Sequence, residues 1–124
     1  DGAKRDLFSR FDIGGSNPAA TPDIVVEADG KILAVIDVKY KPARKIPDRS
    51  EINQIMCYGS SYGCDKVMIL YPQPIKDQAS VCSIGMVGAI QVFRASLDLK
   101  AADLKAEEKS FANAVRQQLE TIEP

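Results

Sequence analysis

Two runs of largely apolar and β-branched residues, 24–27 and 32–40, place the tightest limit on what this chain can fold into. They are separated by Ala-Asp-Gly-Lys at positions 28–31, a sequence that strongly predicts a β-hairpin. The second run is apolar on both faces from residue 32 to residue 36. A strand with two apolar faces is covered on both sides, so we expect this run to be a central strand of a sheet.

Three charged residues, Asp23, Asp37 and Lys39, lie beside or within these runs. Charged groups at such positions are costly unless they are paired or bind a metal ion. Whether the three share a face depends on the hairpin turn, because a shift of one residue moves every side chain to the other face. A two-residue turn at 29–30 would place Asp23 and Asp37 on opposite faces. We therefore predict a three-residue turn in which Gly30 adopts the left-handed position of a G1 bulge, with Asp23 opposite Val35 and diagonal to Asp37.

The rest of the chain shows the pattern of one mixed-sheet α/β domain. Ser50 is a good N-cap and Gly63 a good C-cap for one helix of about three turns. A buried strand is expected at 66–70, and a helix between two buried strands predicts a parallel, right-handed crossover. Three weaker patterns remain: an edge strand at 7–13, two strands at 80–84 and 89–94, and an amphipathic helix at 101–122.

If the two aspartates share a face, their carboxylates and the carbonyl group of Val38 provide oxygen ligands for Mg²⁺, with Mn²⁺ as a substitute. Lys39, held near the metal, could orient or deprotonate an attacking water and offset charge that develops on a phosphate. The arrangement predicts metal-assisted hydrolysis of a phosphodiester. The alternative is a structural ion pair, since such pairs also produce clusters of charged residues.

The composition excludes several other kinds of chemistry. The 124 residues contain no histidine, which excludes Ser-His-Asp and Cys-His nucleophiles and histidine-based zinc hydrolases. A net charge of -1 gives no overall basic field to attract nucleic acid. The three cysteines fit neither a zinc knuckle nor a disulfide framework, so we expect free thiols in a reducing compartment. With neither an apolar run of about 18 residues nor a signal-peptide pattern, we expect a cytoplasmic protein without a membrane partner.

The charged residues match a known pattern. Pro22-Asp23, followed by Asp37-x-Lys39 on the next strand, resembles the PD-(D/E)xK nuclease superfamily, with Asp in place of the commoner Glu. Gln54-x-x-x-Tyr58 resembles the QxxxY element of the RecB-like branch, and its i, i+4 spacing places both side chains on one helical face. The series DVKYK, QIMCY and VMILYP within residues 37–72 is similar to the C-terminal nuclease domain of McrC, the cleavage subunit of McrBC-type restriction systems.

The resemblance covers about residues 21–74. It implies a single nuclease domain with a restriction-endonuclease-like αβββαβ core, in which a central mixed sheet is flanked by helices, extended by C-terminal strands and a helix. It also implies Mg²⁺-dependent cleavage of double-stranded DNA in modification-dependent restriction and phage defence. The implied partners are a McrB-like AAA+ GTPase motor and a second nuclease subunit. Residues 1–10 contain no counterpart of the superfamily's first core helix, so we expect this part of the fold to be truncated.

Two further groups of residues have candidate roles. Gln54 and Tyr58 would steady Lys39 or contact a phosphate; alternatively, the tyrosine packs and the glutamine caps the sheet edge. The basic residues after the second strand would contact the DNA backbone, or else belong to an ordinary solvated loop. These basic residues are Lys41, Arg44, Lys45 and Arg49. The alternative function is a catalytically inactive nuclease-fold module that docks DNA or assembles with the motor.

Overall fold

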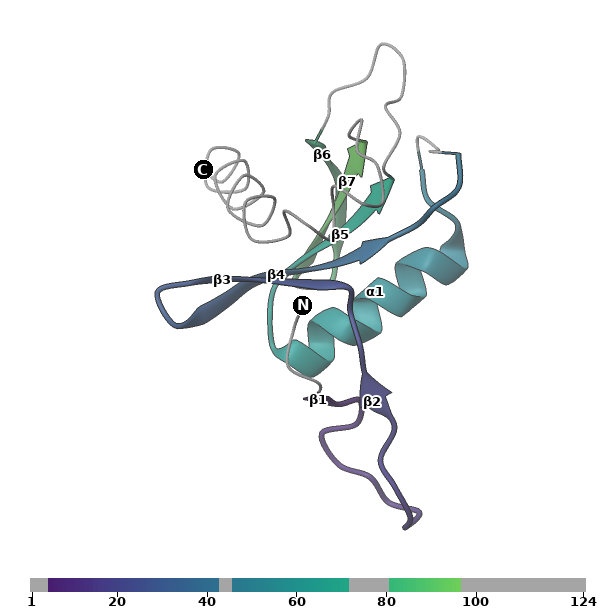
Figure 1. The fold of residues 1–124 in the computed structure, drawn as a ribbon, viewed down its shortest axis with the longest axis vertical. Coiled ribbons are helices and arrows are strands. Elements are labelled where there is room, and N and C mark those ends of the chain that lie inside the picture. The colour runs from purple at the N-terminus through teal and green to yellow at the C-terminus, as the bar shows by residue number, and fades with distance from the viewer. Residues whose placement is uncertain (1–4, 43–45, 72–80, 97–124) are drawn as a thin grey trace.

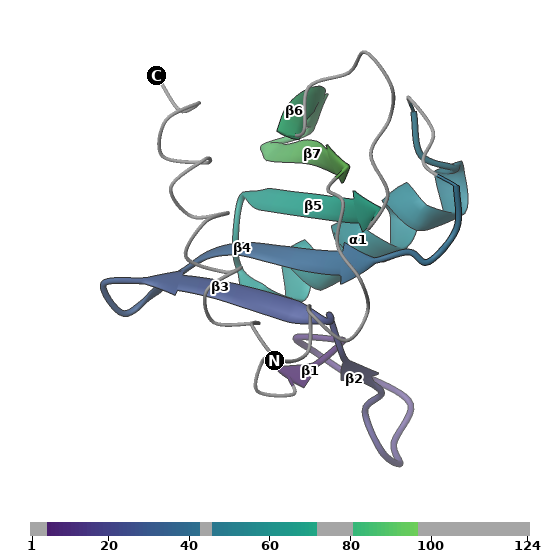
Figure 2. The ribbon, with the colours of Figure 1, turned by 45° about the horizontal axis from the view of Figure 1, so that its top comes forward.

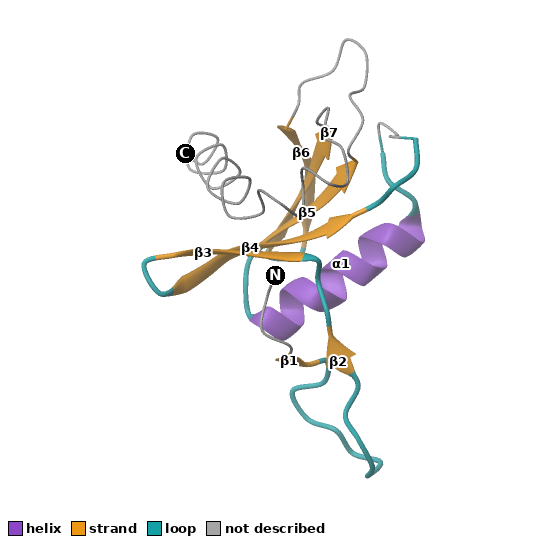
Figure 3. Cartoon of the chain, viewed as in Figure 1, coloured by secondary structure: helices purple, strands orange, loops and turns teal. Residues whose placement is uncertain are grey.

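One helix packs against one face of a mixed five-stranded sheet (Figures 1 and 3). The structure is a computed structural model that describes residues 5–42, 46–71 and 81–96. The predicted amphipathic helix at 101–122 lies outside the described residues. The described α1 (Arg49–Tyr62) has 14 residues, and no helix in this part of the chain is long and apolar enough to cross a membrane.

The sheet has the strand order β3-β4-β5-β7-β6, and Figure 2 shows the strands side by side. Its strands are β3 (Ile24–Ala28), β4 (Lys31–Val38), β5 (Lys66–Tyr71), β6 (Val81–Val87) and β7 (Ile90–Ser96). The three inner strands β4, β5 and β7 are parallel, and the two edge strands β3 and β6 are antiparallel to their neighbours. The predictions of a central β4, of a strand after the helix and of a parallel β4-α1-β5 connection are confirmed.

The N-terminal residues do not join this sheet. β1 (Arg5–Asp6) and β2 (Ala19–Ala20) form a separate two-stranded sheet. The predicted edge strand at 7–13 is wrong, because this segment is a loop between β1 and β2. Its rings pack on each other, with the centroids of Phe8 and Phe11 5.6 Å apart, and the Asn17 side chain hydrogen bonds to both backbone groups of Phe8. Two strands of the large sheet therefore precede α1 in the described residues, where the αβββαβ pattern has three.

The ends of α1 follow from local chemistry. The helix begins after Asp48, whose extended backbone makes it the N-cap, so the prediction of Ser50 as the N-cap is wrong. The backbone N–H of Asp48 donates a hydrogen bond to Glu51 Oε1 at 3.0 Å, which satisfies a group that lacks a helical partner. The predicted C-cap is confirmed: Gly63 has a φ of 65°, in the left-handed region.

The face of the sheet that carries α1 positions the candidate site. Its core includes the fully buried Val35, Ile55, Val67 and Ile69. Alternation along β4 places Asp37 on the same face as Val35, whereas Ile36 and Val38 belong to the core on the opposite face. The charged end of β4 therefore lies against the helix.

Candidate functional site

The turn between β3 and β4 decides how the two aspartates meet. It is a two-residue turn, with Asp29 and Gly30 at φ values of 53° and 77°, so the predicted three-residue turn is wrong. A β-bulge in β4, in which Leu33 is the extra residue opposite Val26 and Glu27, shifts the register before the strands reach the site, and Ile24 then pairs with Ile36.

This register differs from the predicted one by two residues. Continued by one position beyond the Ile24–Ile36 pair, it places Asp23 opposite Asp37 instead of opposite Val35. The prediction that both aspartates share a face is correct, because the bulge supplies the odd residue that the turn lacks.

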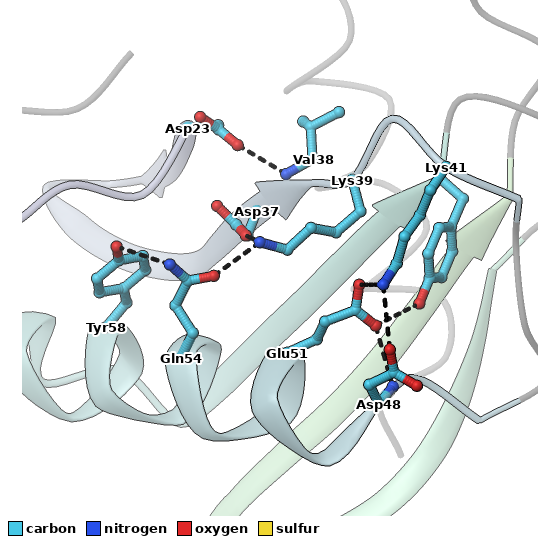
Figure 4. A network of polar contacts seen from close by, with 10 residues as sticks. Asp23, Asp37, Val38, Lys39, Lys41, Asp48, Glu51, Gln54 and Tyr58 are labelled. Atoms are coloured by element: carbon cyan, nitrogen blue, oxygen red, sulfur yellow. Dashed lines mark hydrogen bonds and ion pairs between the residues drawn. The ribbon is translucent and has the colours of Figure 1, made fainter.

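The two carboxylates lie beside the end of β4 (Figure 4). Asp23 Oδ2 accepts a hydrogen bond from the backbone N–H of Val38 at 2.7 Å, which attaches the start of β3 to β4. Burial raises the pKa of the Asp37 carboxyl above its ordinary value; the neighbouring Asp23 raises it further, and Lys39 lowers it. Two carboxyl groups that repel each other in a partly desolvated place are typical of a cation-binding or catalytic site.

Lys39 links the strand to the helix. Its Nζ lies 2.7 Å from Asp37 Oδ2 and donates a hydrogen bond of 2.7 Å to Gln54 Oε1 (Figure 4). The amide N–H of Gln54 in turn donates to the hydroxyl oxygen of Tyr58 at 3.3 Å. The predicted contact between Gln54 and Lys39 is therefore present. The amide is oriented at both ends, because its N–H group faces Tyr58 and its oxygen faces the ammonium group.

A second set of contacts lies one helical turn earlier and involves Glu51, which the sequence reasoning missed. Glu51 is buried, and its Oε1 accepts hydrogen bonds from the backbone of Asp48 and from the Tyr71 hydroxyl at 3.1 Å. Its Oε2 lies 2.8 Å from Lys41 Nζ. Although burial raises the pKa of Glu51, the contacts with Lys41, Asp48 and Tyr71 lower it overall. The Asp48-x-x-Glu51 spacing of a capping box was the available sequence signal.

The predicted DNA-contacting residues have different surroundings. The Lys41 ammonium is already engaged by Glu51 and by Asp48, whose Oδ2 lies 3.1 Å away, and both carboxylates raise its pKa. Arg49 is exposed at the first position of α1. Arg44 and Lys45 lie outside the described residues. A role of these side chains in DNA binding stays a prediction.

The donor atoms fit a hard divalent cation. Mg²⁺ typically takes one or two carboxylates from a protein and keeps several water ligands, which matches the Asp23 and Asp37 pair. Apart from its ion pair with Lys39, the buried Oδ2 of Asp37 has no hydrogen-bond partner in the described structure. No group of three or more His, Cys, Asp or Glu side chains that could hold a metal occurs among the residues described. The Val38 carbonyl stays a predicted ligand.

Comparisons with known proteins give no match to a family model, to a curated protein or to a solved structure. The functional argument therefore rests on the residues and contacts of the site.

Proposed function

We propose that this domain is a Mg²⁺-dependent DNA endonuclease of the PD-(D/E)xK type. The observation that carries the proposal is the convergence of Asp23, Asp37 and Lys39 beside the end of β4, with Gln54 of α1 holding the Lys39 ammonium. Asp37 lies in β4, whereas Asp23 lies just before β3, Lys39 just after β4 and Gln54 on α1, so segments distant in sequence supply the residues that the motif predicts.

Asp23 and Asp37 would hold the cation, either Mg²⁺ or Mn²⁺. When bound, the cation would supply Lewis-acid stabilisation of the phosphate and lower the pKa of a water ligand. Burial and the neighbouring Asp23 raise the pKa of Asp37, which is the direction expected where two carboxyls lie close together and a cation would relieve their repulsion.

Lys39 would position the nucleophile and offset negative charge on the phosphate. Its ammonium contacts both Asp37 and Gln54, so it retains the Gln54 contact when the carboxylates are engaged elsewhere. Tyr58 fixes the orientation of the Gln54 amide and acts through it. Gln54 and Tyr58 are therefore positioning residues for the lysine.

The resemblance to McrC supports a finer proposal. The domain would be the DNA-cleaving part of a McrBC-type modification-dependent restriction system, with double-stranded DNA as substrate and a McrB-like AAA+ GTPase as partner. The net charge of -1 is consistent with this division of labour, because a domain without a basic field depends on a partner to deliver DNA.

Plasmid cleavage tests the proposal. Wild type, Asp37→Ala and Lys39→Met would be incubated with supercoiled plasmid and Mg²⁺ or Mn²⁺, with and without a motor subunit. Loss of the lysine is expected to slow nicking roughly 100-fold or more. The control is Asp12→Asn, which removes a carboxylate from an exposed ion pair in the loop between β1 and β2.

Calorimetric titration with Mn²⁺ separates the outcomes. Uptake by wild type but not by Asp37→Ala, together with cleavage by wild type alone, supports a nuclease. Uptake and DNA binding without cleavage would indicate the catalytically inactive docking module. Equal nicking by wild type and Asp37→Ala would contradict the proposed chemistry.

A further inference from the structure

We propose that Glu51 and Lys41 are positioning residues for the candidate site: their ion pair sets the place of Lys39 against α1. This inference rests on the proposed function for its catalytic consequence. The observation is a pair of matched contacts between the end of β4 and the first turns of α1, Lys39 with Gln54 and Lys41 with Glu51.

These contacts join a tight turn to one face of the helix. Lys39 and Lys41 lie on either side of Tyr40 in a γ-turn, because the N–H of Lys41 donates to the Lys39 carbonyl. Gln54 and Glu51 are three residues apart on α1, so they lie on one helical face about 4.5 Å apart along its axis. Lys39 reaches Gln54 and Lys41 reaches Glu51, and Figure 4 shows both lysine side chains ending beside the helix. We call these contacts the two-lysine ladder.

The backbone connects the two contacts closely. The N–H of Lys39 donates to the Leu70 carbonyl at 2.8 Å, and the N–H of Lys41 donates to the Lys39 carbonyl at 2.9 Å. Leu70 is followed by Tyr71, whose hydroxyl contacts Glu51. Glu51 thus contacts the side chain of Lys41, which is one backbone partner of Lys39, and the side chain of Tyr71, which follows the other partner in sequence.

Helix capping alone does not account for the contacts of the Glu51 carboxylate. A capping glutamate needs one contact, with the backbone N–H of the N-cap residue. Here Oε1 also accepts from Tyr71, and Oε2 contacts Lys41, so one buried carboxylate joins β5, α1 and the segment after β4. Loss of Lys41 leaves the buried Glu51 carboxylate without its opposite charge, which is unfavourable and makes the local geometry depend on the pair.

Solution NMR tests this arrangement without substrate. The ¹H–¹³Cε signal of Lys39 would be assigned by its absence from the spectrum of Lys39→Arg. Its chemical shift in Gln54→Ala would then mark the loss of the Lys39–Gln54 contact. Glu51→Gln and Lys41→Gln are expected to move this signal toward the Gln54→Ala position. Lys41→Arg, which keeps the charge, is expected to return it toward wild type. The signal of Lys31, which is exposed at the start of β4, is expected to stay in place.

Kinetics test the catalytic consequence. Glu51→Gln and Lys41→Gln are expected to lower kcat roughly 10-fold to 100-fold with KM for DNA unchanged, because the lysine is displaced while DNA contacts are kept. A role of Lys41 in DNA binding would instead raise KM and reduce the salt dependence of binding. The matched control is Asp12→Asn, which removes a carboxylate from the exposed Arg10–Asp12 ion pair.

The two proposals fail in different ways. An unmoved Lys39 signal in folded Lys41→Gln would overturn the two-lysine ladder even if wild type cuts DNA. A moved signal with unchanged kcat in an active enzyme would overturn the positioning role. If wild type neither cuts DNA nor takes up Mn²⁺, the proposed function fails, and the NMR result still decides whether the ladder orients Lys39. Lys41→Gln provides the test if Glu51→Gln does not fold, because Lys41 is partly exposed.

Discussion

At Gly59, α1 packs so closely on the sheet that a substitution can measure the contact. A Cβ atom at this position would overlap Cγ1 of Val67, closer than carbon atoms approach in real structures. Val67 is fully buried on β5, and its branched side chain has few alternative rotamers in a packed core. Gly59→Ala therefore requires the helix to move away from the sheet.

Two opposing contributions set the size of the effect. Alanine is better than glycine in a helix interior by about 1 kcal/mol. Overpacking of a buried contact costs about 1–3 kcal/mol. Because Val67 cannot easily rotate away, we expect the free energy of unfolding to fall by about 1–2 kcal/mol, and the melting temperature by about 4–8 °C.

Urea and thermal unfolding of wild type, Gly59→Ala and Ser60→Ala would measure this. Ser60 is the next residue of the same helix and is exposed, so Ser60→Ala gains helix propensity without an overlap and is expected to be stabilising by about 0.5 kcal/mol. If Gly59→Ala is stabilised as Ser60→Ala is, the close packing of α1 on β5 is wrong. The same displacement should weaken the Lys39–Gln54 contact and slow cleavage.

Two further predictions concern the hairpin that carries the aspartates. Burial and Asp23 raise the pKa of folded Asp37 above 3.8. As the pH rises past 3.8, the native state therefore keeps more bound protons than the unfolded state. Ionisation of Asp37 thus lowers stability progressively as the pH rises. Asp37→Asn should therefore abolish cleavage. In urea titrations it should increase the free energy of unfolding, and the increase should be larger at about pH 7 than at about pH 4. A variant that is less stable than wild type at both pH values would contradict this. Gly30→Ala places a side chain at a φ of 77° and should cost about 1–2 kcal/mol in thermal unfolding, whereas Lys31→Ala at the exposed neighbouring position should change little.

The sequence predicted the central elements well because their signals are local. The two apolar faces of β4, the buried run of β5 and Gly63 after the helix each follow from side-chain burial or backbone freedom within a few residues. Helix spacing likewise predicted that Gln54 and Tyr58 share a face, and their contact is present. The edge strand at 7–13 failed because Phe8 and Phe11 pack on each other, Leu7 packs against the core on the α1 face, and Ile13 is exposed.

The details of the site were harder to predict, because they depend on register and on contacts between distant segments. The bulge at Leu33 lies in a run of ordinary strand residues, and nothing in their identities distinguishes a bulged position from a regular one. Glu51 looked like a surface residue at a helix start, and its burial depends on Tyr71, twenty residues later in the sequence. Contacts of that kind appear only when the helix is placed on the sheet.

The turn and the bulge of β4 also restrict how the length of β3 can change. With both retained, removing one residue from β3 would place Asp23 opposite Ile36 and turn its carboxylate toward the opposite side of the sheet, although no functional side chain would be altered. Insertions or deletions of two residues keep the orientation. In variants that keep Asp23 and Asp37 together, length differences in β3 should therefore come in even numbers.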